Sequence, residues 1–548
     1  MRFLPAGDAA LLVELPDLSH TLGLYRAVQA RPIAGVREMV PAARTLLVHY
    51  EPSSTSAVAV VTALRERAAQ VSLGQSDAPP ARVVEIPVHY HGEDLSEVAE
   101  LLGIAEREVI ARHTGQPWQA AFAGFAPGFV YLAGGHPGFQ LPRRKTPRTR
   151  VPAGSVALAG DFSAVYPTAS PGGWQLIGVT GVPMWDLARA EPAFVQPGFG
   201  VQFTDADVPG RHVSLPPQAA TPPEPVKQHE SNQPPEHVGQ VQAAITIEAS
   251  GLQTLVQDAG RHGLAGLGVS SAGALDLPAL RQANRLVGNP VHTPVLENLL
   301  GGLALRCHGR ATLAVAGAPV GLTLQAADGR SWPVASHAAV ALDDGDRLTL
   351  AAPIAGVRCY VAVRGGWDVA PVLGSCSSDT LAHIGPPALQ AGQTLAVGHA
   401  VTRNALRATA APDAPPHDLP RPGAEVVLDV LPGPRADWFT PEALLLLQSQ
   451  RWRVTPQSNR IGVRLAGDPA LARSRHQELP SEGTVTGAIQ VPASGQPVLF
   501  LADHPLTGGY PVIAVVASHH LALAAQLPAG CGVRFRVIAP FHVEEGQS

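Results

Sequence analysis

Five basic residues lie close together in LPRRKTPRTRV, residues 141–151. Guanidinium groups bind carboxylates and phosphates through paired, charge-assisted hydrogen bonds. A solvated basic loop would have the same composition, but only 15% of the chain is charged, so this local density favours an anion-binding site. The five residues are Arg143, Arg144, Lys145, Arg148 and Arg150.

Glycines beside aromatic residues form a second group. Glycine lets the backbone approach a ligand closely, and an aromatic side chain can form the wall of a pocket. For FAGFAPGFVYL taken alone, a β-turn with core phenylalanines is the favoured interpretation. The residues concerned are Phe125 and Gly128 in that segment, Gly172 and Gly173 before Trp174, and Gly508 and Gly509 before Tyr510.

One histidine and two polar turns are candidates for acid–base or polar chemistry. His113 ends a predicted helix, where the helix dipole favours a histidine without any catalytic role, although a general base could also lie there. Asp258 and Arg261 lie in a glycine-bounded turn that an ion pair alone would explain. Asn459 and Arg460, in QSNRIGVR, offer groups for polar recognition.

Metal and cofactor motifs are scarce. His89 and His91 fall on one face of a strand, but no third ligand is evident, and His519-His520 look incidental, so we predict no metal site. The four cysteines form no CxxC pair. The sequence has no GxxxxGK[ST], no Ala-Met-Lys-Met and no GxSxG, which excludes a P-loop, covalently bound biotin and an α/β-hydrolase nucleophile elbow.

The bulk composition is that of a globular chain with several domains. A length of 548 residues exceeds what one hydrophobic core supports, and 45% of the residues are hydrophobic. The formal charge of -5 gives no reason to expect a nucleic-acid or membrane partner. The first residues lack the basic-then-apolar pattern of a signal peptide, so we expect a cytoplasmic protein.

The elements that must position these residues are mostly strands. Residues 9–15 and 45–50 are apolar runs of strand length, and Ser56–Gln70 has helical periodicity behind a serine cap. Residues 94–113 indicate one helical stretch. Elsewhere, short strands separated by Gly and Pro favour barrels or sandwiches over a doubly wound sheet.

A faint internal similarity links the two halves of the chain. Residues 151–179 and 484–516 each begin with glycine and small aliphatic residues, and each has a later Gly-Gly-aromatic sequence before an apolar strand. Chance is a competing explanation, because glycine turns before strands are common. Between the halves, residues 212–240 contain seven prolines and should form an extended linker.

Together these motifs resemble two related families. RHTGQPWQAAFAGFAPGFVYL, TPRTRVPAGSVALAG and YPTASPGGWQLIG resemble the allophanate hydrolase subunit 1 family, which includes the B-type component of 5-oxoprolinase. LQTLVQDAGRHGLAGLGVSSAGALD, QSNRIGVRL, GAIQVPASGQP and ADHPLTGGYP resemble the allophanate hydrolase subunit 2 family, which includes the C-type component of 5-oxoprolinase. The resemblance covers nearly the whole chain apart from the linker.

The resemblance implies a fold that is mainly β with α+β parts, with cyclophilin-like barrels in both halves, paired as in the carboxyltransferase part of urea carboxylase. It divides the chain into a small α+β domain (1–78), a cyclophilin-like barrel (79–211), the linker (212–240), a first β-rich domain (241–410) and a second cyclophilin-like β-rich domain (411–548).

The resemblance also implies an activity. It implies ATP-driven opening of 5-oxoproline to glutamate, with Mg and ATP as cosubstrate and a separate A-type component as partner; formation of a homo-oligomer is left open. Its motifs carry the expected site. The catalytic candidates are His113, Arg148, Asp258 and Asn459, and the substrate- or phosphate-binding candidates are Phe125, Gly128, Arg143, Arg150, Ser155, Tyr166, Gly172, Gly173, Arg261, Ser271, Arg460, Gln490, Gly508, Gly509 and Tyr510.

Three motifs depart from the family pattern, and one of them is ADHPLTGGYP, which differs from the usual Ala-Asp-x-Gln-Thr-Thr. Val512 stands where relatives usually have lysine after Gly-Gly-Tyr-Pro, and Phe162–Pro167 differs from the usual Gln-Thr-Gly-Ile-Tyr-Pro. We expect these motifs to face the pocket and to affect substrate choice or activity. One alternative is carboxyl transfer from carboxybiotin on a partner to a urea-like or amide acceptor. Another is non-catalytic regulation of a histidine kinase.

Overall fold

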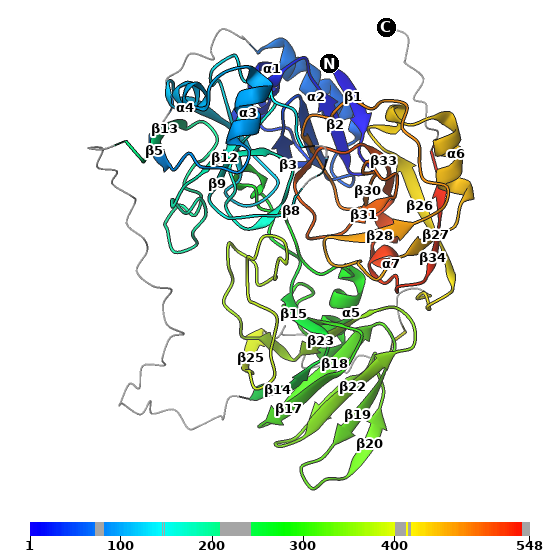
Figure 1. Cartoon of the computed structure of the whole chain (residues 1–548). Helices are drawn as coiled ribbons and strands as arrows, with labels where there is room; N and C mark the ends of the chain where they lie inside the picture. The colour runs from blue at the N-terminus through cyan, green and yellow to red at the C-terminus, as the bar shows by residue number, and fades with distance from the viewer. Residues whose placement is uncertain are drawn as a thin grey trace.

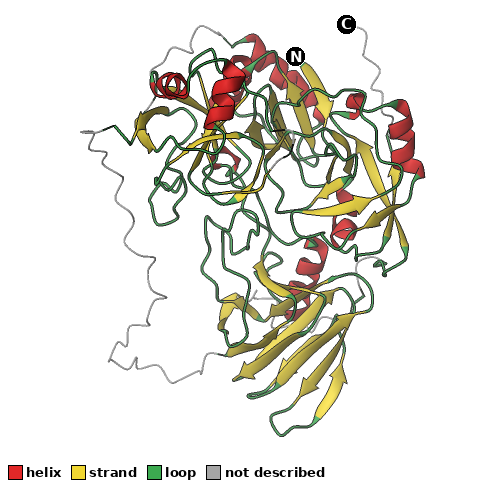
Figure 2. Ribbon diagram, in the orientation of Figure 1, coloured by secondary structure: helices red, strands yellow, loops and turns green. Residues whose placement is uncertain are grey.

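Strands dominate the computed structural model (Figure 2), which confirms the mainly β fold class. The structure describes residues 1–71, 80, 82–144, 146, 148–208, 243–400, 413–414 and 418–539. The linker predicted at 212–240 and Lys145 lie outside the described residues.

The N-terminal residues form an antiparallel sheet of order β1-β2-β4-β3 with two helices on one face. The side chains of β4 alternate, so that Leu46 and Val48 pack towards the helices while Leu47 points to the other side. Ser56 caps α2 as predicted and accepts a hydrogen bond from the Ala59 backbone N–H. The elements are β1 (Arg2–Pro5), β2 (Ala10–Glu14), α1 (Leu18–Ala30), β3 (Val36–Pro41), β4 (Thr45–Tyr50) and α2 (Ala57–Ala69).

The next part is a seven-stranded sheet of order β12-β9-β10-β7-β6-β13-β5. A bridge between His89 and Val179 joins its two outer strands through backbone hydrogen bonds of 2.8 and 2.9 Å, so the sheet closes into a first barrel. Its strands are β5 (Val83–Val88), β6 (Trp118–Ala123), β7 (Val130–Ala133), β9 (Ser155–Ala159), β10 (Phe162–Val165), β12 (Gln175–Val179) and β13 (Gly200–Asp205), and β8 (Arg148–Val151) pairs separately with β11 (Ser170–Gly172).

The helical stretch predicted at 94–113 is two helices, which corrects the prediction of one. They are α3 (Leu95–Leu102) and α4 (Glu106–Thr114). Gly103 ends α3 with a φ of 66°, a left-handed conformation that glycine adopts without steric cost. The break lets both helices pack their apolar sides against the first barrel.

The second half begins with a β-sandwich. A seven-stranded sheet (β20-β19-β22-β17-β14-β25-β24) packs on a five-stranded sheet (β15-β16-β23-β18-β21) around one apolar core, and α5 covers the outer face of the smaller sheet. The elements are β14 (Ala244–Ser250), β15 (Gln253–Gln257), η2 (Ala265–Leu267), α5 (Leu277–Val287), β16 (Val295–Leu299), β17 (Leu303–His308), β18 (Ala311–Gly317), β19 (Val320–Gln325), β20 (Ser331–Val334), β21 (Ala339–Leu342), β22 (Arg347–Pro353), β23 (Arg358–Val363), β24 (Gly365–Trp367) and β25 (Thr394–Ala400).

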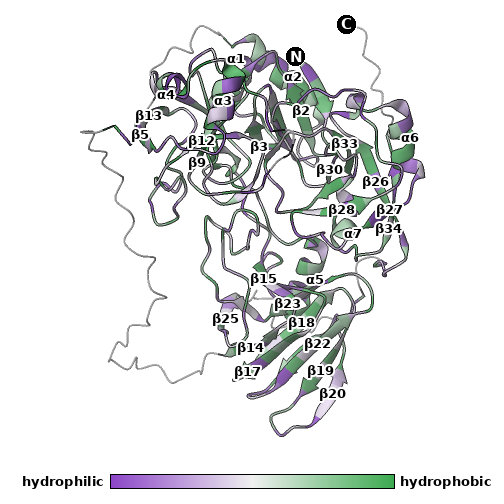
Figure 3. Cartoon of the chain, viewed as in Figure 1, coloured by the Kyte–Doolittle hydropathy of each residue, from purple (hydrophilic) through white to green (hydrophobic). Residues whose placement is uncertain are grey.

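The chain then closes a second barrel, of order β26-β33-β30-β31-β28-β27-β34. Figure 3 shows hydrophobic residues along strands of this barrel and of the sandwich. The elements are β26 (Glu425–Pro432), η4 (Ala436–Trp438), α6 (Pro441–Ser449), β27 (Trp452–Val454), β28 (Gly462–Ala466), β29 (Glu482–Gly483), β30 (Ala488–Gln490), β31 (Val498–Phe500), β32 (Thr507–Gly508), β33 (Val512–Val516), η5 (Ser518–His520), α7 (Leu521–Ala525) and β34 (Gly532–Val537).

The two barrels have the same topology. Going round each barrel, β5-β13-β6-β7-β10-β9-β12 corresponds strand for strand to β26-β34-β27-β28-β31-β30-β33, including one parallel pair in each. A matching detail is the tryptophan that begins the strand after the helix: Trp118 donates to the His113 carbonyl at 3.0 Å, and Trp452 donates to the Leu447 carbonyl at 3.1 Å. The internal similarity between residues 151–179 and 484–516 therefore reflects repeated architecture.

The two halves pack against each other rather than lying apart. In Figure 1 the N-terminal sheet lies beside the C-terminal barrel. Leu12 and Leu47 of the sheet share an apolar cluster with Val485 and Val515 of the second barrel. Buried Arg435 of the second barrel donates at 2.9 Å to Glu14 of β2 and also pairs with Glu482. These contacts hold the N-terminal sheet and the second barrel in a fixed relation.

Candidate active site between the two barrels

A cavity of about 530 Å³ lies between the barrels and is lined by residues of both. Its volume is within the range of about 300–1,000 Å³ that small-molecule sites occupy. The first half contributes Phe125, Phe129, Tyr131, Arg143, Arg144, Tyr166, Pro171, Gly172, Gly173 and Trp174, and the second contributes Arg473, His476, Gln477, Glu478, Leu479, Ser481, Gln490, Ala493, Pro505, Thr507, Gly508, Gly509 and Tyr510.

Each barrel presents its Gly-Gly-aromatic turn to this cavity. A Cβ atom on Gly172 would lie 2.4 Å from the Tyr166 hydroxyl oxygen, and one on Gly508 would lie 2.6 Å from Gln490 Nε2. Both glycines therefore allow a side chain of a neighbouring segment to support the turn. Gln490 Nε2 donates to the Tyr510 carbonyl at 3.0 Å. The repeat thus places equivalent turns on opposite sides of one pocket.

Arg143 crosses from the first barrel to the second. Its backbone N–H donates to Glu478 Oε1 at 3.0 Å, and its Nη2 donates to Ser481 Oγ at 2.9 Å. A Cβ atom on Gly509 would lie 2.0 Å from Arg143 Nη1, so a larger residue at this turn would displace the guanidinium group from its present position. The positive charge of the first module is therefore positioned by residues of the second.

Three hydroxyl groups meet beside Arg143. The Tyr131 hydroxyl lies 3.0 Å from Ser481 Oγ and 3.4 Å from Thr507 Oγ1. Because each hydroxyl can donate or accept, this cluster can bind an oxygen atom whose charge increases during a reaction.

One wall of the cavity is aromatic. The Phe129 ring packs edge to face against Tyr131, Tyr166 and Trp174, with ring centroids 5.2 to 5.5 Å apart. Phe125 completes this wall with a φ of 64°, an unusual conformation for a non-glycine residue. Burial, with a contribution from Tyr131, raises the pKa of Tyr166, so its hydroxyl stays protonated. The cavity combines an apolar wall with cationic groups, which suits a small organic anion.

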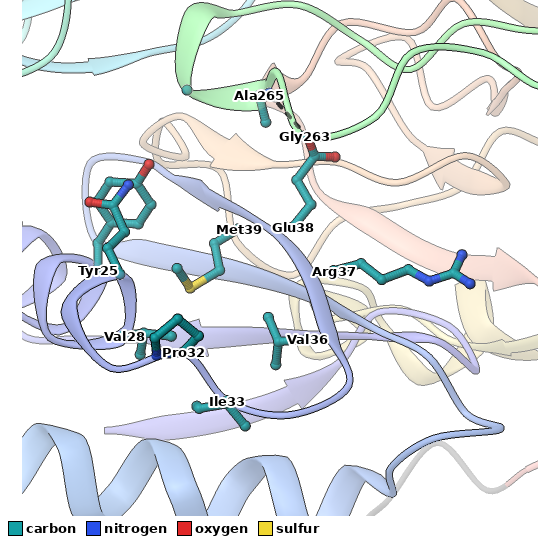
Figure 4. Close-up of a pocket in the computed structure, with 12 residues that line it drawn as sticks. Tyr25, Val28, Pro32, Ile33, Val36, Arg37, Glu38, Met39, Gly263 and Ala265 are labelled. Atoms are coloured by element: carbon teal, nitrogen blue, oxygen red, sulfur yellow. Dashed lines mark hydrogen bonds between the residues drawn. The ribbon is translucent and has the colours of Figure 1, made fainter.

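A second cavity, of about 350 Å³, lies at the edge of β3 (Figure 4). Its floor is aliphatic, with Val28, Ile33 and Val36, and Glu38 accepts a hydrogen bond from the Ala265 backbone N–H at 3.1 Å. Arg37, which also lines this cavity, forms an ion pair with Glu51. Because this cavity has one carboxylate and no cluster of cations, it suits an organic anion less well than the cavity between the barrels.

The structure places nine predicted binding residues on the cavity between the barrels. They are Phe125, Arg143, Tyr166, Gly172, Gly173, Gln490, Gly508, Gly509 and Tyr510. The four catalytic candidates are elsewhere, and each has a structural role. His113 is fully buried in the first barrel, where its ring nitrogens contact the Tyr90 hydroxyl at 2.7 Å and Ser163 Oγ at 2.8 Å. His113 therefore belongs to the interior of the first barrel and does not line the cavity between the barrels.

The other three catalytic candidates organise loops. Arg148 forms a two-pronged pair with Asp94, at 2.7 and 2.9 Å. Asp258 accepts hydrogen bonds from the Ser375 hydroxyl and from the Cys376 backbone N–H, which ties two loops of the sandwich together. Asn459 is exposed, and its side chain accepts from two backbone N–H groups of its own turn. None of the three lines the cavity between the barrels, and each organises its own loop or turn.

The remaining binding candidates also lie away from the cavity lining. Arg460 is buried and joins the sandwich to the second barrel through Glu297 and Asp503. Arg261 is buried and donates to the Ser377 carbonyl. Arg150 is exposed on β8, Ser155 is buried in β9, Ser271 bonds to the Arg261 backbone N–H through its carbonyl, and Gly128 packs against Met184 and Trp185.

Val512 has a different role from the predicted one. Its side chain is buried in the apolar cluster between the N-terminal sheet and the second barrel, with Leu12 and Leu47. The position where relatives usually have lysine therefore lies in a contact between the halves and not on the described cavity lining. This corrects the expectation that the position faces the pocket.

His519 and His520 are not incidental. Among the described residues they form, with Asp429, the one group whose possible ligand atoms lie within 4.8 Å of one another. Arg536 already donates to Asp429 at 2.6 and 2.9 Å, and His520 Nδ1 accepts the Asp429 backbone N–H. The group is explained as an ion-pair network.

Four lining residues were not among the predicted site residues. Tyr131 and Thr507 stand inside the motifs FAGFAPGFVYL and ADHPLTGGYP, so those motifs were a signal for them. Ser481 and Arg473 lie in loop sequence without a motif of its own. Residues of the two halves meet only because the halves dock.

No helix in the described part of the chain is both long enough and apolar enough to cross a membrane. Family models for the carboxyltransferase domain match both halves, subdomains C and D over residues 1–195 and subdomains A and B over residues 267–537.

Named relatives follow the same division. The second half is 37% identical to the C component of 5-oxoprolinase from Escherichia coli K12 over 299 residues, which is 53% of this chain and 90% of the relative. The first half is 36% identical to the B component of 5-oxoprolinase from Escherichia coli O157:H7 over 206 residues, which is 36% of this chain and 92% of the relative.

A solved structure shares the complete arrangement. The crystal structure of TTHA0988 matches 96% of this chain and 99% of its own length, with 34% identity and a TM-score of 0.77. The chain belongs to the carboxyltransferase-domain family and joins a module like the B component of 5-oxoprolinase to a module like its C component in one polypeptide.

Proposed function

We propose that this chain supplies the B and C components of an ATP-dependent 5-oxoprolinase, which opens the 5-oxoproline lactam to L-glutamate together with a separate A-type component. The relatives matched by the two halves are named as parts of one enzyme, which supports a joint function of the halves. The observation that carries the proposal is the cavity between the barrels, because neither half alone provides both its aromatic wall and its full set of cations.

The chemistry requires activation of a poor electrophile. In the proposed reaction the lactam carbonyl oxygen attacks the terminal phosphorus of ATP and ADP leaves. Water then adds to the activated carbon, the C–N bond breaks as nitrogen takes a proton, and a second water releases phosphate. Arg143 and the hydroxyls of Tyr131 and Ser481 would stabilise the negative charge on the transferring oxygen.

The donor set suits phosphate binding without a P-loop. Arg143 offers a guanidinium group, and the Gly508-Gly509 turn lets oxygen atoms approach the backbone closely. Glu478 is the one carboxylate among the described residues lining the cavity, and it would share a Mg ion with the phosphates and water.

A coupled assay tests the proposal. The purified chain is combined with its A-type partner, Mg, ATP and 5-oxoproline, and glutamate and ADP are measured. We expect both products in equal amounts, and we expect Arg143→Ala to reduce their formation by about 100-fold. Absence of turnover with a partner that is shown to bind would refute the proposed function.

Carboxyl transfer is the second candidate, because the matched models describe carboxyltransferase subdomains. The same cavity would then accept carboxybiotin presented by a partner and a urea-like or amide acceptor. Loss of a labelled carboxyl group from carboxybiotin on a carrier protein, in the absence of ATP, would favour this reaction over lactam opening.

A further inference from the structure

We propose that Arg473 is the residue that selects the substrate by binding its carboxylate. The inference rests on the proposed function for the identity of the acid. It assigns different tasks to two of the three arginines among the described residues that line the cavity, with Arg143 at the reacting oxygen and Arg473 at the unreactive carboxylate. The third, Arg144, is already paired with Asp94 and Glu97.

The guanidinium of Arg473 is held in place by its own barrel. Its Nη2 donates to the Val491 carbonyl, and its Cζ lies 5.8 Å from the centroid of the Tyr510 ring. A stacked and hydrogen-bonded guanidinium has a fixed plane, so little conformational entropy is lost when it binds a planar anion.

Arg473 has an unused donor. Its Nε is buried and has no hydrogen-bond partner among the described residues. Buried N–H groups are almost always hydrogen-bonded in native proteins, so this donor is available to an acceptor that reaches it. Burial lowers the pKa of Arg473, and nearby Tyr510 opposes this shift.

Neighbouring charges do not satisfy Arg473. Glu478, the carboxylate on the lining, accepts the Arg143 backbone N–H at 3.0 Å. Arg475, two residues further along the chain, lies 3.2 Å from Asp437 and over the Trp438 ring, and it is not part of the cavity. Of these two arginines, Arg473 alone lines the cavity.

The cavity also orients the acid. Arg143 and Arg473 contact consecutive residues, Gly509 and Tyr510, while the aromatic wall comes from the other barrel. A compact ring with one carboxylate fits this polarity, because its apolar carbons contact the wall and its charge pairs with Arg473. The lactam carbonyl is then available to Arg143 and the hydroxyl cluster.

Equilibrium binding tests the inference without ATP or a partner. Calorimetry compares 5-oxoproline with its neutral primary amide on the full chain and on Arg473→Ala, Arg473→Lys and the control Arg475→Ala. We expect the full chain and Arg475→Ala to prefer the acid by about 10- to 100-fold. Arg473→Ala should lose this preference, and Arg473→Lys, which retains charge but not the paired donors, should retain part of it.

The outcomes separate this inference from the proposed function. Preference for the acid that persists in Arg473→Ala, equal loss in Arg475→Ala, or no binding of either compound by the full chain overturns the role of Arg473. If the coupled assay gives no turnover but the acid preference depends on Arg473, the carboxylate anchor stands and the proposed reaction fails. Arg473→Lys keeps the charge, so partial retention of the acid preference in this variant shows that the loss in Arg473→Ala is not a folding defect.

Discussion

Gly509 shows how a single residue can control the position of a guanidinium group that belongs to a different module. Any side chain there would meet Arg143 Nη1, because a Cβ atom would lie 2.0 Å away. We expect Gly509→Ala to displace the guanidinium and to lower 5-oxoproline turnover by about 100-fold, since misplacement of about 1 Å can cost that much. Steady-state rates with the A-type partner measure the loss.

Two further variants serve as controls for the rate of Gly509→Ala. Gly181→Ala adds a methyl group where nothing lies within 4 Å, so its rate should be unchanged. In an Arg143→Ala background, Gly509→Ala should have little further effect, because both changes act on one interaction. Additive losses in the double variant would show that Gly509 acts through something other than Arg143.

At the scale of elements, helix α4 is joined to the first barrel through a neutral histidine. Burial lowers the pKa of His113 to about 3 from 6.5. The unfolded chain therefore binds the proton more tightly, so stability from this group is present at neutral pH and is lost as pH falls from 6.5 towards 3. Between pH 7 and pH 5 the loss should be about 2 kcal/mol.

Denaturant unfolding monitored at several pH values tests this prediction. His113→Gln removes the titrating group, so the variant should be less stable at pH 7 but should have a flatter pH dependence between about 7 and 5. The exposed His292, changed in the same way, should leave the curve unaltered. An unchanged slope in His113→Gln would show that other groups control acid unfolding.

At the scale of the whole molecule, the site exists because the two halves dock. Leu47 is fully buried between the N-terminal sheet and the second barrel. A Cβ atom on Gly483 would lie 2.6 Å from the Leu47 Cβ atom. We expect Leu47→Asp to separate the halves and abolish activity, because a buried unpaired carboxylate costs several kcal/mol. Co-purification of residues 1–208 with residues 243–539, expressed as two chains, measures docking directly.

The matched control for docking is Val58→Asp on α2 of the same domain. Val58 is 76% exposed, so a carboxylate there stays hydrated and the halves should still co-purify. If the two halves remain associated and active when the first carries Leu47→Asp, the apolar cluster is not what holds the modules together.

Prediction from sequence succeeded where the signal was local. The Gly-Gly-aromatic turns and Arg143 were identified correctly as cavity residues, because a glycine turn next to an aromatic residue leaves a pattern within a few positions. It did not place His113 and Arg148 away from the cavity, because a polar residue that satisfies a buried partner looks the same in sequence as one that contacts substrate. Arg473 was missed because its loop has no motif of its own.

The sequence by itself determined the mainly β fold class, the membership of both halves in their families and the repeat that relates them, because strand periodicity, turn residues and motif order are properties of neighbouring positions. Only the tertiary structure decided which residues share a cavity. The contacts of Arg143 with Ser481 and of Tyr131 with Thr507 join positions hundreds of residues apart. They depend on how two closed barrels pack, and packing is a property of complementary surfaces rather than of spacing along the chain.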